Sequence, residues 1–513
     1  MKITNILSAG ALSALCLANA ACSEDTMDRI NKDTHHPQAE VVDAKYQVTD
    51  AIVASVFTVN TGSLCWYTSI YTEQTFGTGN NQAMNAEMRN VNEVAAAATH
   101  DNEWNGAYQN LNNIKQMMEK CTTGKHDIKG AGEVLYAYNW GIMTDLFGDI
   151  PFTEALTDGI SAPKIDSQKQ IYDSIYVYLD RAVADLNTAI ANNESNMGSQ
   201  DVLYSNNNQK WLGLAYALKA RYLLHTLGRA DDKATRLTEV IAACDSALAK
   251  GFQGADLDIF TGYDSGSTNA WSAYWLSRDY IGATTTVDNI LLERQNPIEP
   301  FYNCNFADWY DINGQLATPG DEELAKKTGY CTLPYWLYQG YASQVASHLM
   351  SISELYFIKA ECLARQGKTA DDATLKAAFE AGINAAMTDL FKSCGESYDV
   401  TYTATYLAGT TGEKFKENPL SEILVQKYIA QTRDEQLETY CDMRRCRYID
   451  GSYPVAMTNT NNTVNGNNRW PLRLPYGSSD VLSNPNVKAA FGSGNDAGMY
   501  IYTENVWWAG GTR

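Results

Sequence analysis

The chain has 513 residues, enough for one large domain with insertions or for two to three ordinary domains. Its formal net charge of −21 argues against nucleic-acid binding, which requires clustered Lys and Arg, and any membrane attachment should therefore be covalent. With 32 Tyr and 11 Trp, the chain has more large aromatic residues than a core usually needs, and we expect some of them to face a ligand or a partner.

The first 21 residues have the features of an export signal. Lys2 supplies a positive charge, residues 6–17 form a short apolar run, and small residues precede Cys22. This pattern resembles a bacterial lipoprotein signal, with Cys22 as the acylated first residue, followed by a polar tether over 22–42. An ordinary secretory peptide cut near Ala21 is the alternative. No later run of about 18 apolar residues predicts a membrane-spanning helix.

Helical periodicity dominates the rest of the chain. Apolar residues recur at three- and four-residue spacing, most clearly at 352–365, where Gly367 stands at the position of a left-handed C-cap. The pattern predicts helices over 43–60, 91–121 (one long or broken helix), 132–147, 168–191, 211–228, 237–249, 352–365, 373–390 and 420–448.

Consecutive helices joined by short turns suggest a repeat of helix pairs. Three such units are expected, at 132–191, 211–250 and 352–390, with irregular spacing. This is typical of degenerate tetratricopeptide-like pairs, which bury their apolar faces against one another. We therefore predict a mainly α fold in which tetratricopeptide-like helix pairs, over about 91–250 and 350–448, pack against a loop-rich region with short strands.

Two segments lack sustained periodicity. Residues 252–349 form an aromatic insertion, and residues 449–513 are rich in Gly, Asn and Pro. A long, weakly patterned insertion in a helical protein usually carries function. We expect 43–513 to form a single domain, with the last part made of loops and short strands.

Cysteine and charge patterns give no catalytic or metal site. After removal of the signal and lipidation of Cys22, an odd number of scattered cysteines remains, which implies no disulfide framework. No zinc, nucleotide or nucleophile-elbow motif is present. Arg444, Arg445 and Arg447 lie beside Glu438 and Asp442 on one predicted helix, where structural ion pairs are the favoured interpretation over an anion site.

Several short runs together resemble the SusD/RagB family of outer-membrane nutrient-binding lipoproteins. Besides the lipoprotein start, they are Leu146–Ala155 (LFGDIPFTEA), Ser353–Glu361 (SELYFIKAE), Glu422–Ile429 (EILVQKYI), Glu438–Arg447, Arg469–Tyr476 (RWPLRLPY) and Asn505–Ala509 (NVWWA). The resemblance extends from end to end of the chain.

The resemblance implies four tetratricopeptide-like helix pairs and a loop-rich region that carries the binding site. It also implies a lipid-anchored protein at the cell surface of the outer membrane, which is not an enzyme and acts with a SusC-type TonB-dependent transporter. Glycans are the commonest cargo. Capture of oligopeptides, or a scaffold role without a ligand, remains open, as does a structural calcium ion.

Sugar binding requires aromatic platforms beside polar side chains, since sugars present apolar faces framed by hydroxyl groups. The stretches 66–81 and 262–310 contain this mixture, and core packing is an equally good explanation for each aromatic residue. We expect either Trp271 or Trp275, four residues apart, to be an exposed platform. The candidate ligand-binding residues are Trp66, Tyr67, Phe76, Asn81, Trp271, Tyr274, Trp275 and Tyr280.

Overall fold

The computed structural model describes residues 42–79, 81–262, 267–294, 314–338 and 342–513. One compact unit spans Ala44–Arg513, and a second unit spans Met1–Asp43, of which only the last two residues are described. The expected signal segment, the lipidation at Cys22 and most of the tether therefore lie outside the described residues. No helix in the described ranges is both long and apolar enough to cross a membrane.

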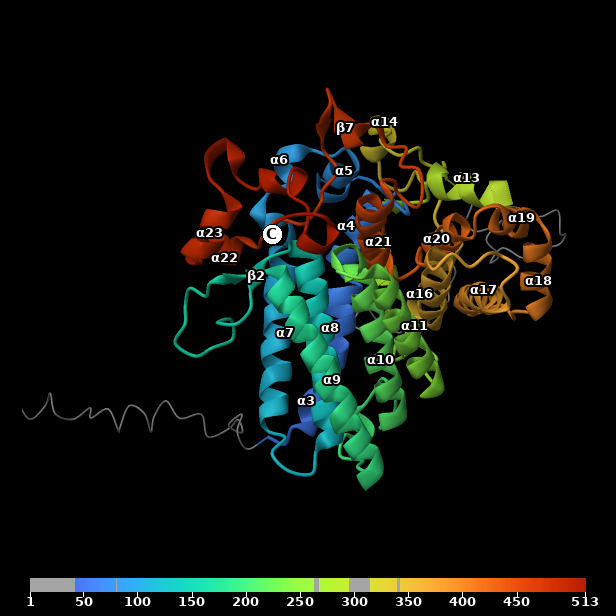
Figure 1. Cartoon of the computed structure of the whole chain (residues 1–513). Coiled ribbons are helices and arrows are strands. Elements are labelled where there is room, and N and C mark those ends of the chain that lie inside the picture. Colours follow the sequence, from blue (N-terminus) through green and yellow to red (C-terminus); the bar gives the residue numbers. More distant parts are fainter. Residues whose placement is uncertain (1–41, 80, 263–266, 295–313, 339–341) are drawn as a thin grey trace, which may run out of the picture. The chain divides into compact units, whose positions relative to one another are not determined.

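The compact unit is mainly helical (Figure 1). The N-terminal half contains α3 (Lys45–Ala54), a π-helical turn (Ser55–Asn60), α4 (Ser63–Tyr71), α5 (Asn81–Glu87), α6 (Val91–Val94), α7 (Asp101–Glu119), α8 (His126–Phe147), α9 (Gln168–Asn192), α10 (Asn208–His225) and α11 (Lys233–Ala249). The C-terminal half contains α12 (Ala270–Arg278), α13 (Thr285–Arg294), α14 (Glu322–Ala325), α15 (Tyr335–Tyr338), α16 (Ile352–Arg365), α17 (Ala373–Ser393), α18 (Val400–Ala408), α19 (Thr410–Glu417), α20 (Pro419–Ala430), α21 (Gln436–Asp450), α22 (Ser478–Ser483) and α23 (Pro485–Phe491).

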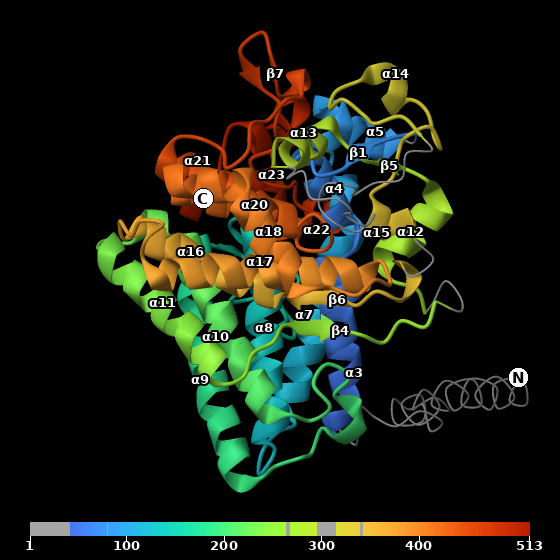
Figure 2. The same ribbon diagram turned by 90° about the vertical axis from the view of Figure 1, so that its right-hand side faces the viewer.

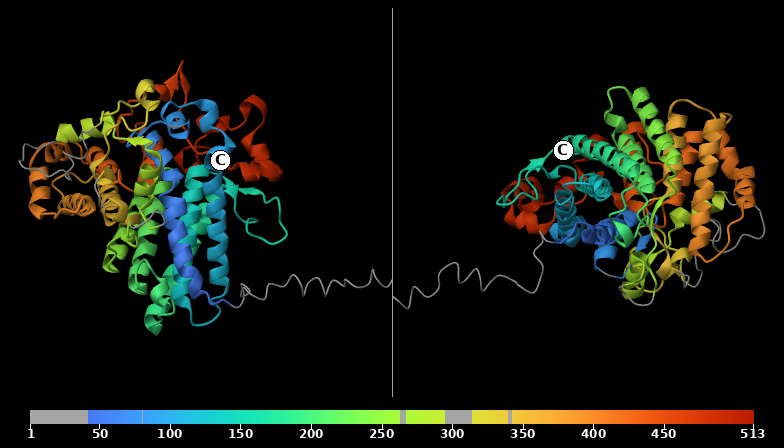
Figure 3. Two further views of the ribbon diagram at one scale, coloured as in Figure 1. Left: turned by 180° about the vertical axis from the view of Figure 1, so that it is seen from behind. Right: turned by 90° about the horizontal axis from the view of Figure 1, so that it is seen from below.

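The three predicted helix pairs are confirmed as α8–α9, α10–α11 and α16–α17, whose members pack most extensively against each other. Contacts of α7 with α8, α9 with α10 and α11 with α16 join these pairs into one layer. Figure 1 shows α7 to α10 side by side, and the right panel of Figure 3 looks along α7 and α8. Each helix thus buries one apolar face against its neighbours, as helix-pair repeats do.

Local sequence signals explain where the pair α16–α17 begins and ends. The Ser351 side chain accepts a hydrogen bond from the Glu354 amide at the start of α16, and the Asp372 side chain accepts from the amides of Thr374 and Leu375 at the start of α17. Gly367 has a φ of +87°, the left-handed conformation expected after the end of α16.

Three predicted helices are interrupted. The segment 43–60 changes from α3 to a π-helical turn, and 91–121 breaks into α6, a 3₁₀ turn and α7. The predicted helix 420–448 is two helices, α20 and α21, separated by residues 431–435. These five residues are buried and mostly polar, and their side chains bond to other segments; Arg433 with Asp389 is one example. Tertiary contacts therefore outweigh the helical pattern there.

The described strands form four two-stranded antiparallel sheets (Figure 2). They are β1 (Phe76–Gly77) with β5 (Ile281–Gly282), β2 (Ile150–Pro151) with β3 (Ile165–Asp166), β4 (Ala255–Leu257) with β6 (Ser347–Met350), and β7 (Thr463–Val464) with β8 (Asn467–Asn468). The last pair and short helices make up the C-terminal segment, where only loops and strands were expected. Figure 2 shows α4, α5, β1, β5, α12 and α15 gathered in one region, and this region contains the candidate site.

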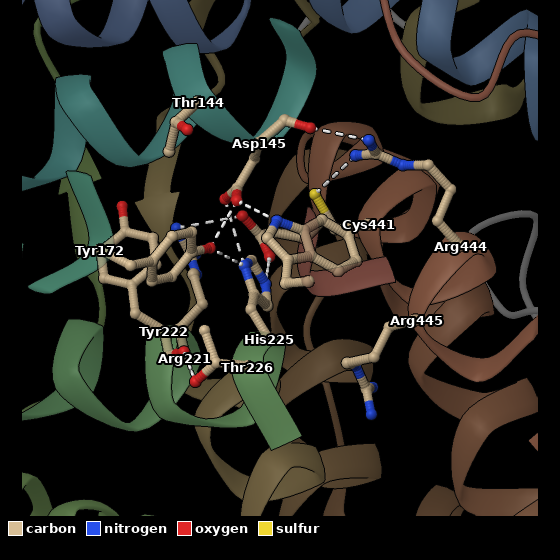
Figure 4. A network of polar contacts seen from close by, with 12 residues as sticks. Thr144, Asp145, Tyr172, Arg221, Tyr222, His225, Thr226, Cys441, Arg444 and Arg445 are labelled. Carbon is tan, nitrogen blue, oxygen red and sulfur yellow. Dashed lines mark hydrogen bonds and ion pairs between the residues drawn. The ribbon is translucent and has the colours of Figure 1, made fainter. Parts of the chain in front are cut away.

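Buried ion pairs connect the helix pairs to α21 (Figure 4). His225 of α10 lies between two carboxylates, with Nδ1 3.1 Å from Asp145 Oδ2 and Nε2 2.9 Å from Glu438 Oε2. Burial alone would lower the pKa of His225, but Asp145 and Glu438 outweigh it and raise that pKa to about 9.

Further along α21, Arg445 binds both carboxylate oxygens of Glu361 on α16 and also bonds to Asp442. Arg444 donates to the backbone carbonyl of Asp145 at 2.7 Å. The prediction of structural ion pairs is therefore confirmed for Arg445, Glu438 and Asp442, whereas Arg444 and Arg447 donate to backbone carbonyls.

Candidate functional site

A hollow of about 490 Å³ opens between α4, α12 and the start of α7. We call it the main hollow. Its lining residues are Phe57, Gly62, Ser63, Trp66, Tyr67, Gln82, Ala98, Thr99, Asn102, Glu103, Ala270, Ala273, Tyr274, Ser277 and Arg278. The volume is within the usual range for small-ligand sites, about 300–1,000 Å³.

Two aromatic rings dominate the wall of the main hollow. Trp66 of α4 and Tyr274 of α12 stack with their ring centroids 3.6 Å apart and their planes 17° from parallel. Behind them, Trp271 meets Trp66 edge-on at 6.5 Å, and Trp336 meets Trp271 edge-on at 5.7 Å. The two rings cover each other's facing sides, both are half-buried, and both line the main hollow, where further rings pack behind them.

Tyr67 lies next to this stack on α4. Burial raises the pKa of its hydroxyl, and the neighbouring Tyr274, Tyr71 and Glu103 raise it further. Tyr67 therefore stays neutral at physiological pH and is able to donate or accept a hydrogen bond through its hydroxyl.

The walls of the main hollow come from distant parts of the sequence and are tied together by short contacts. Strands β1 and β5 pair between α4 and α12, and Thr78 Oγ1 donates to the carbonyl of Asp279 at 3.1 Å. At the other end of α12, Asn269 caps the helix and donates to the carbonyl of Val345 at 3.0 Å.

The third wall is the start of α7, which is held by the C-terminal segment. Trp104 Nε1 donates to Asp480 Oδ2 at 2.9 Å, and the amide of Ser479 donates to Asp101 Oδ1 at 2.8 Å. Gly477 packs directly on Trp104, since a Cβ there would lie 2.6 Å from the indole. The absence of a side chain at 477 therefore allows this close approach.

The structure brings three of the eight candidate residues to the main hollow: Trp66, Tyr67 and Tyr274. Tyr280 packs edge-on against Tyr274 at 6.2 Å and is half-buried. Asn81 begins α5, and its side chain lies outside the described structure.

Two other candidates are packing residues. Phe76 is fully buried and Trp271 is 1% exposed, so neither ring offers a face to a ligand in this structure. Trp275 is half-buried and does not line the main hollow. The expectation of an exposed platform is therefore wrong for Trp271, and the aromatic residue of α12 that lines the main hollow is Tyr274.

The polar lining residues were not predicted. They are Ser63, Gln82, Thr99, Asn102, Glu103, Ser277 and Arg278. Most stand near helix termini, where polar residues are common for capping alone, so the sequence gives no signal that separates them from ordinary helix ends.

A second and larger hollow, of about 580 Å³, lies between α17, α18 and α19. Its aromatic lining consists of Phe379 and Phe415, which stack on each other at 4.1 Å and are both buried. Because these rings are turned into the core, this hollow lacks an exposed aromatic platform. The main hollow is therefore the better ligand site.

One buried group of side chains has the composition of a metal site. Asp145, His225 and Cys441 place potential ligand atoms within 4.8 Å of one another (Figure 4). Both ring nitrogens of His225 already bond to carboxylates, and Arg444 donates to Cys441 Sγ at 3.3 Å. Burial also raises the pKa of the Cys441 thiol. The group therefore acts as a structural network, in which protons and a guanidinium occupy the positions that a cation would need.

Comparisons with known proteins agree with this architecture. The profile of the SusD-like family, described as starch-binding and associating with the outer membrane, matches residues 44–477. A solved SusD/RagB family protein from Bacteroides thetaiotaomicron is 31% identical, with a TM-score of 0.78 over 92% of this chain and 100% of that one.

More distant solved structures share the fold. A chitin-binding SusD homologue from Flavobacterium johnsoniae is 19% identical, with a TM-score of 0.67 over 90% of this chain and 98% of that one. A SusD homologue from Bacteroides fragilis is 18% identical, with a TM-score of 0.66 over 92% and 100%. No curated protein matches the chain. The family profile and the relative from B. thetaiotaomicron together show that this chain belongs to the SusD/RagB family of SusD-like proteins.

Proposed function

We propose that the protein captures a nutrient glycan, an oligo- or polysaccharide, at the cell surface and delivers it to a SusC-type TonB-dependent transporter of the outer membrane. The observation that carries this proposal is the stacked pair Trp66–Tyr274 in the wall of the main hollow. Acylation at Cys22 would anchor the protein to the membrane.

The chemistry of the main hollow suits a sugar. A pyranose ring has an apolar face that packs on an aromatic surface, while its hydroxyl groups need donors and acceptors around the rim. Ser63, Gln82, Thr99 and Asn102 supply uncharged polar groups in the same hollow as the aromatic pair. The chitin-binding relative from F. johnsoniae adds support for a carbohydrate ligand.

Binding fits the main hollow better than hydrolysis. A typical glycoside hydrolase sets two carboxyl groups on either side of the bond that it cleaves. Among the described residues that line the main hollow, Glu103 alone carries a carboxylate. We therefore propose a binding protein and not an enzyme.

Calorimetry with a soluble form that starts at Ser23 tests the proposal. The protein is titrated with a panel of neutral and acidic polysaccharides and then with mixed oligopeptides. We expect saturable binding of at least one glycan, and we expect Trp66→Ala and Tyr274→Ala each to weaken it by about tenfold or more, as expected for loss of an aromatic platform.

Trp275→Ala is the matched control, because it removes an aromatic ring from the same helix without changing the lining of the main hollow. Thermal unfolding of each variant shows whether the fold is retained. Equal losses in all three variants would place the ligand elsewhere. Binding to peptides alone would overturn the glycan cargo, and no binding to either class would favour a scaffold role in the transporter complex.

A further inference from the structure

A second, smaller hollow lies next to the main hollow. The smaller one, of about 140 Å³, is lined by Tyr67, Tyr71, Gln82, Asn85, Ala86, Glu93, Val94, Ala96, Ala98 and Thr99. We call it the side hollow. Tyr67, Gln82, Ala98 and Thr99 line both hollows, so the two lie next to each other on either side of these residues. We call the two hollows together the cleft; the Trp66–Tyr274 stack lines one of them and Tyr71 the other.

Each hollow contains one carboxylate without a basic partner. Glu103 lines the main hollow and Glu93 lines the side hollow, and neither forms an ion pair with any described Lys, Arg or His. Arg278 of the main hollow likewise has no ion-pair partner among the described residues. No ion pair within the described part of the protein neutralises these three charges, so they are available to a ligand in the cleft.

The positions of the three charges favour a negative field inside the cleft. Glu103 is half-buried. Its charge helps to raise the pKa of the Tyr67 hydroxyl, although burial of that hydroxyl, Tyr274 and Tyr71 contribute more. Arg278, in the last turn of α12, and Glu93 are both exposed, so solvent and salt screen their charges more strongly than that of Glu103. A ligand that packs on the aromatic stack therefore meets the carboxylate of Glu103 in a less screened position than the guanidinium.

A carboxylate in this position accepts hydrogen bonds from sugar hydroxyl groups, and such charge-assisted bonds are stronger than neutral ones. A sugar that carries a carboxylate or sulfate group instead brings a like charge, which Glu103 repels and which the more strongly screened Arg278 offsets only in part. Glu103 and Glu93 thus strengthen the binding of uncharged glycans and weaken the binding of acidic glycans.

We propose that Glu103 and Glu93 determine the charge specificity of the cleft: it takes consecutive sugar units without negative charge and excludes acidic glycans. The proposal rests on the glycan-binding function above. Glu103 has the larger effect, since it shares the main hollow with the aromatic pair.

Matched neutral and acidic ligands test this specificity. The probes are amylose, galactan, cellulose and chitin oligosaccharides, each compared with its carboxymethyl derivative by calorimetry at about 0.1 M salt, where the screening length is about 10 Å. The wild type is expected to bind a neutral probe about tenfold or more tightly than the carboxymethyl form of the same chain. The ratio of the affinities for the neutral and the carboxymethyl probe should decrease about threefold or more in Glu103→Gln, and further in the double variant with Glu93→Gln. Added salt should reduce the difference in affinity between the two probes.

Glu119→Gln is the charge-matched control. It removes the same charge from the same helix, and 16 residues of helix place it ~24 Å along the axis from Glu103, beyond the screening length. The ratio of its affinities for the neutral and the carboxymethyl probe should equal that of the wild type.

The possible failures are distinguishable. If the wild type binds no glycan, the proposed function falls and the specificity proposal falls with it. If neutral glycans bind but the ratio is unchanged in Glu103→Gln, or changes equally in Glu119→Gln, only the specificity proposal is wrong. A larger effect of Arg278→Gln than of Glu103→Gln would show that the guanidinium sets the preference, and would also overturn the specificity proposal.

Discussion

The buried His225 makes the stability of the protein depend on pH above neutrality. Its imidazole bonds to Asp145 and Glu438, and the pKa in the folded state is about 9. The ordinary value in an unfolded chain is about 6.5. Because the fold favours the protonated form, its contribution is complete below about pH 6.5 and is lost as the pH rises through 9.

The size of the effect follows from the pKa difference. Each pKa unit corresponds to about 1.4 kcal/mol, so a shift of about 2.5 units predicts a loss of about 3 kcal/mol in the free energy of unfolding between pH 6.5 and 9.5. The surrounding groups keep the carboxylates in place: Tyr172 and Trp508 donate to Asp145, and Arg221 faces Glu438.

Urea unfolding of the soluble protein at several pH values measures this loss, with His225→Gln as the reference. Three other buried groups titrate in the same range, Glu87 with a pKa of about 7 and Glu133 and Glu354 with pKa values of about 8, so the difference between wild type and variant is the relevant quantity. NMR of ¹³C-labelled histidines gives the pKa directly, since His225→Gln identifies its signal. Parallel stability curves for the two proteins, or a His225 signal that titrates near 6.5, would refute the reasoning.

Two further substitutions test the scaffold. Arg445→Met removes the shared partner of the buried Glu361 and Asp442, which keep Arg365 and Lys427, so we expect a cost of ~3 kcal/mol in urea unfolding, at the lower end of the range for a broken buried pair. Arg447→Met on the exposed side of the same helix should cost well under ~1 kcal/mol. Gly367→Ala adds a methyl group that meets no atom within 4 Å, so its expected cost of ~1 kcal/mol comes from the left-handed backbone alone. An unchanged melting temperature would show that this backbone strain is absent.

The helical scaffold was predictable from the sequence because its signals are local. The periodicity of α16 and α17 and the cap positions around them depend only on neighbouring residues. The break between α20 and α21 was not predictable, since it depends on contacts such as that between Arg433 and Asp389, 44 positions apart. A sequence pattern contains no information about such partners until the fold is known.

The site was predictable only in part. The mixture of aromatic and polar residues marked Trp66, Tyr67 and Tyr274 as candidates, but it did not separate them from Phe76 and Trp271, because a buried ring and an exposed ring leave the same pattern. Residues 98–103 were assigned to the scaffold, although they form the third wall of the main hollow. Only the packing of α7 against the C-terminal segment brings them there.

The pairing of β1 with β5 has a consequence for the order of folding. The hydrogen bond from Thr78 to Asp279 joins residues 201 positions apart, and all of α7 to α11 lies between them in the chain. Closing so long a loop reduces the conformational entropy of the chain before any stabilising contact forms. The intervening helix pairs should therefore form first. The aromatic cleft should then assemble after these helix pairs, and neither of its two segments forms the cleft without the other.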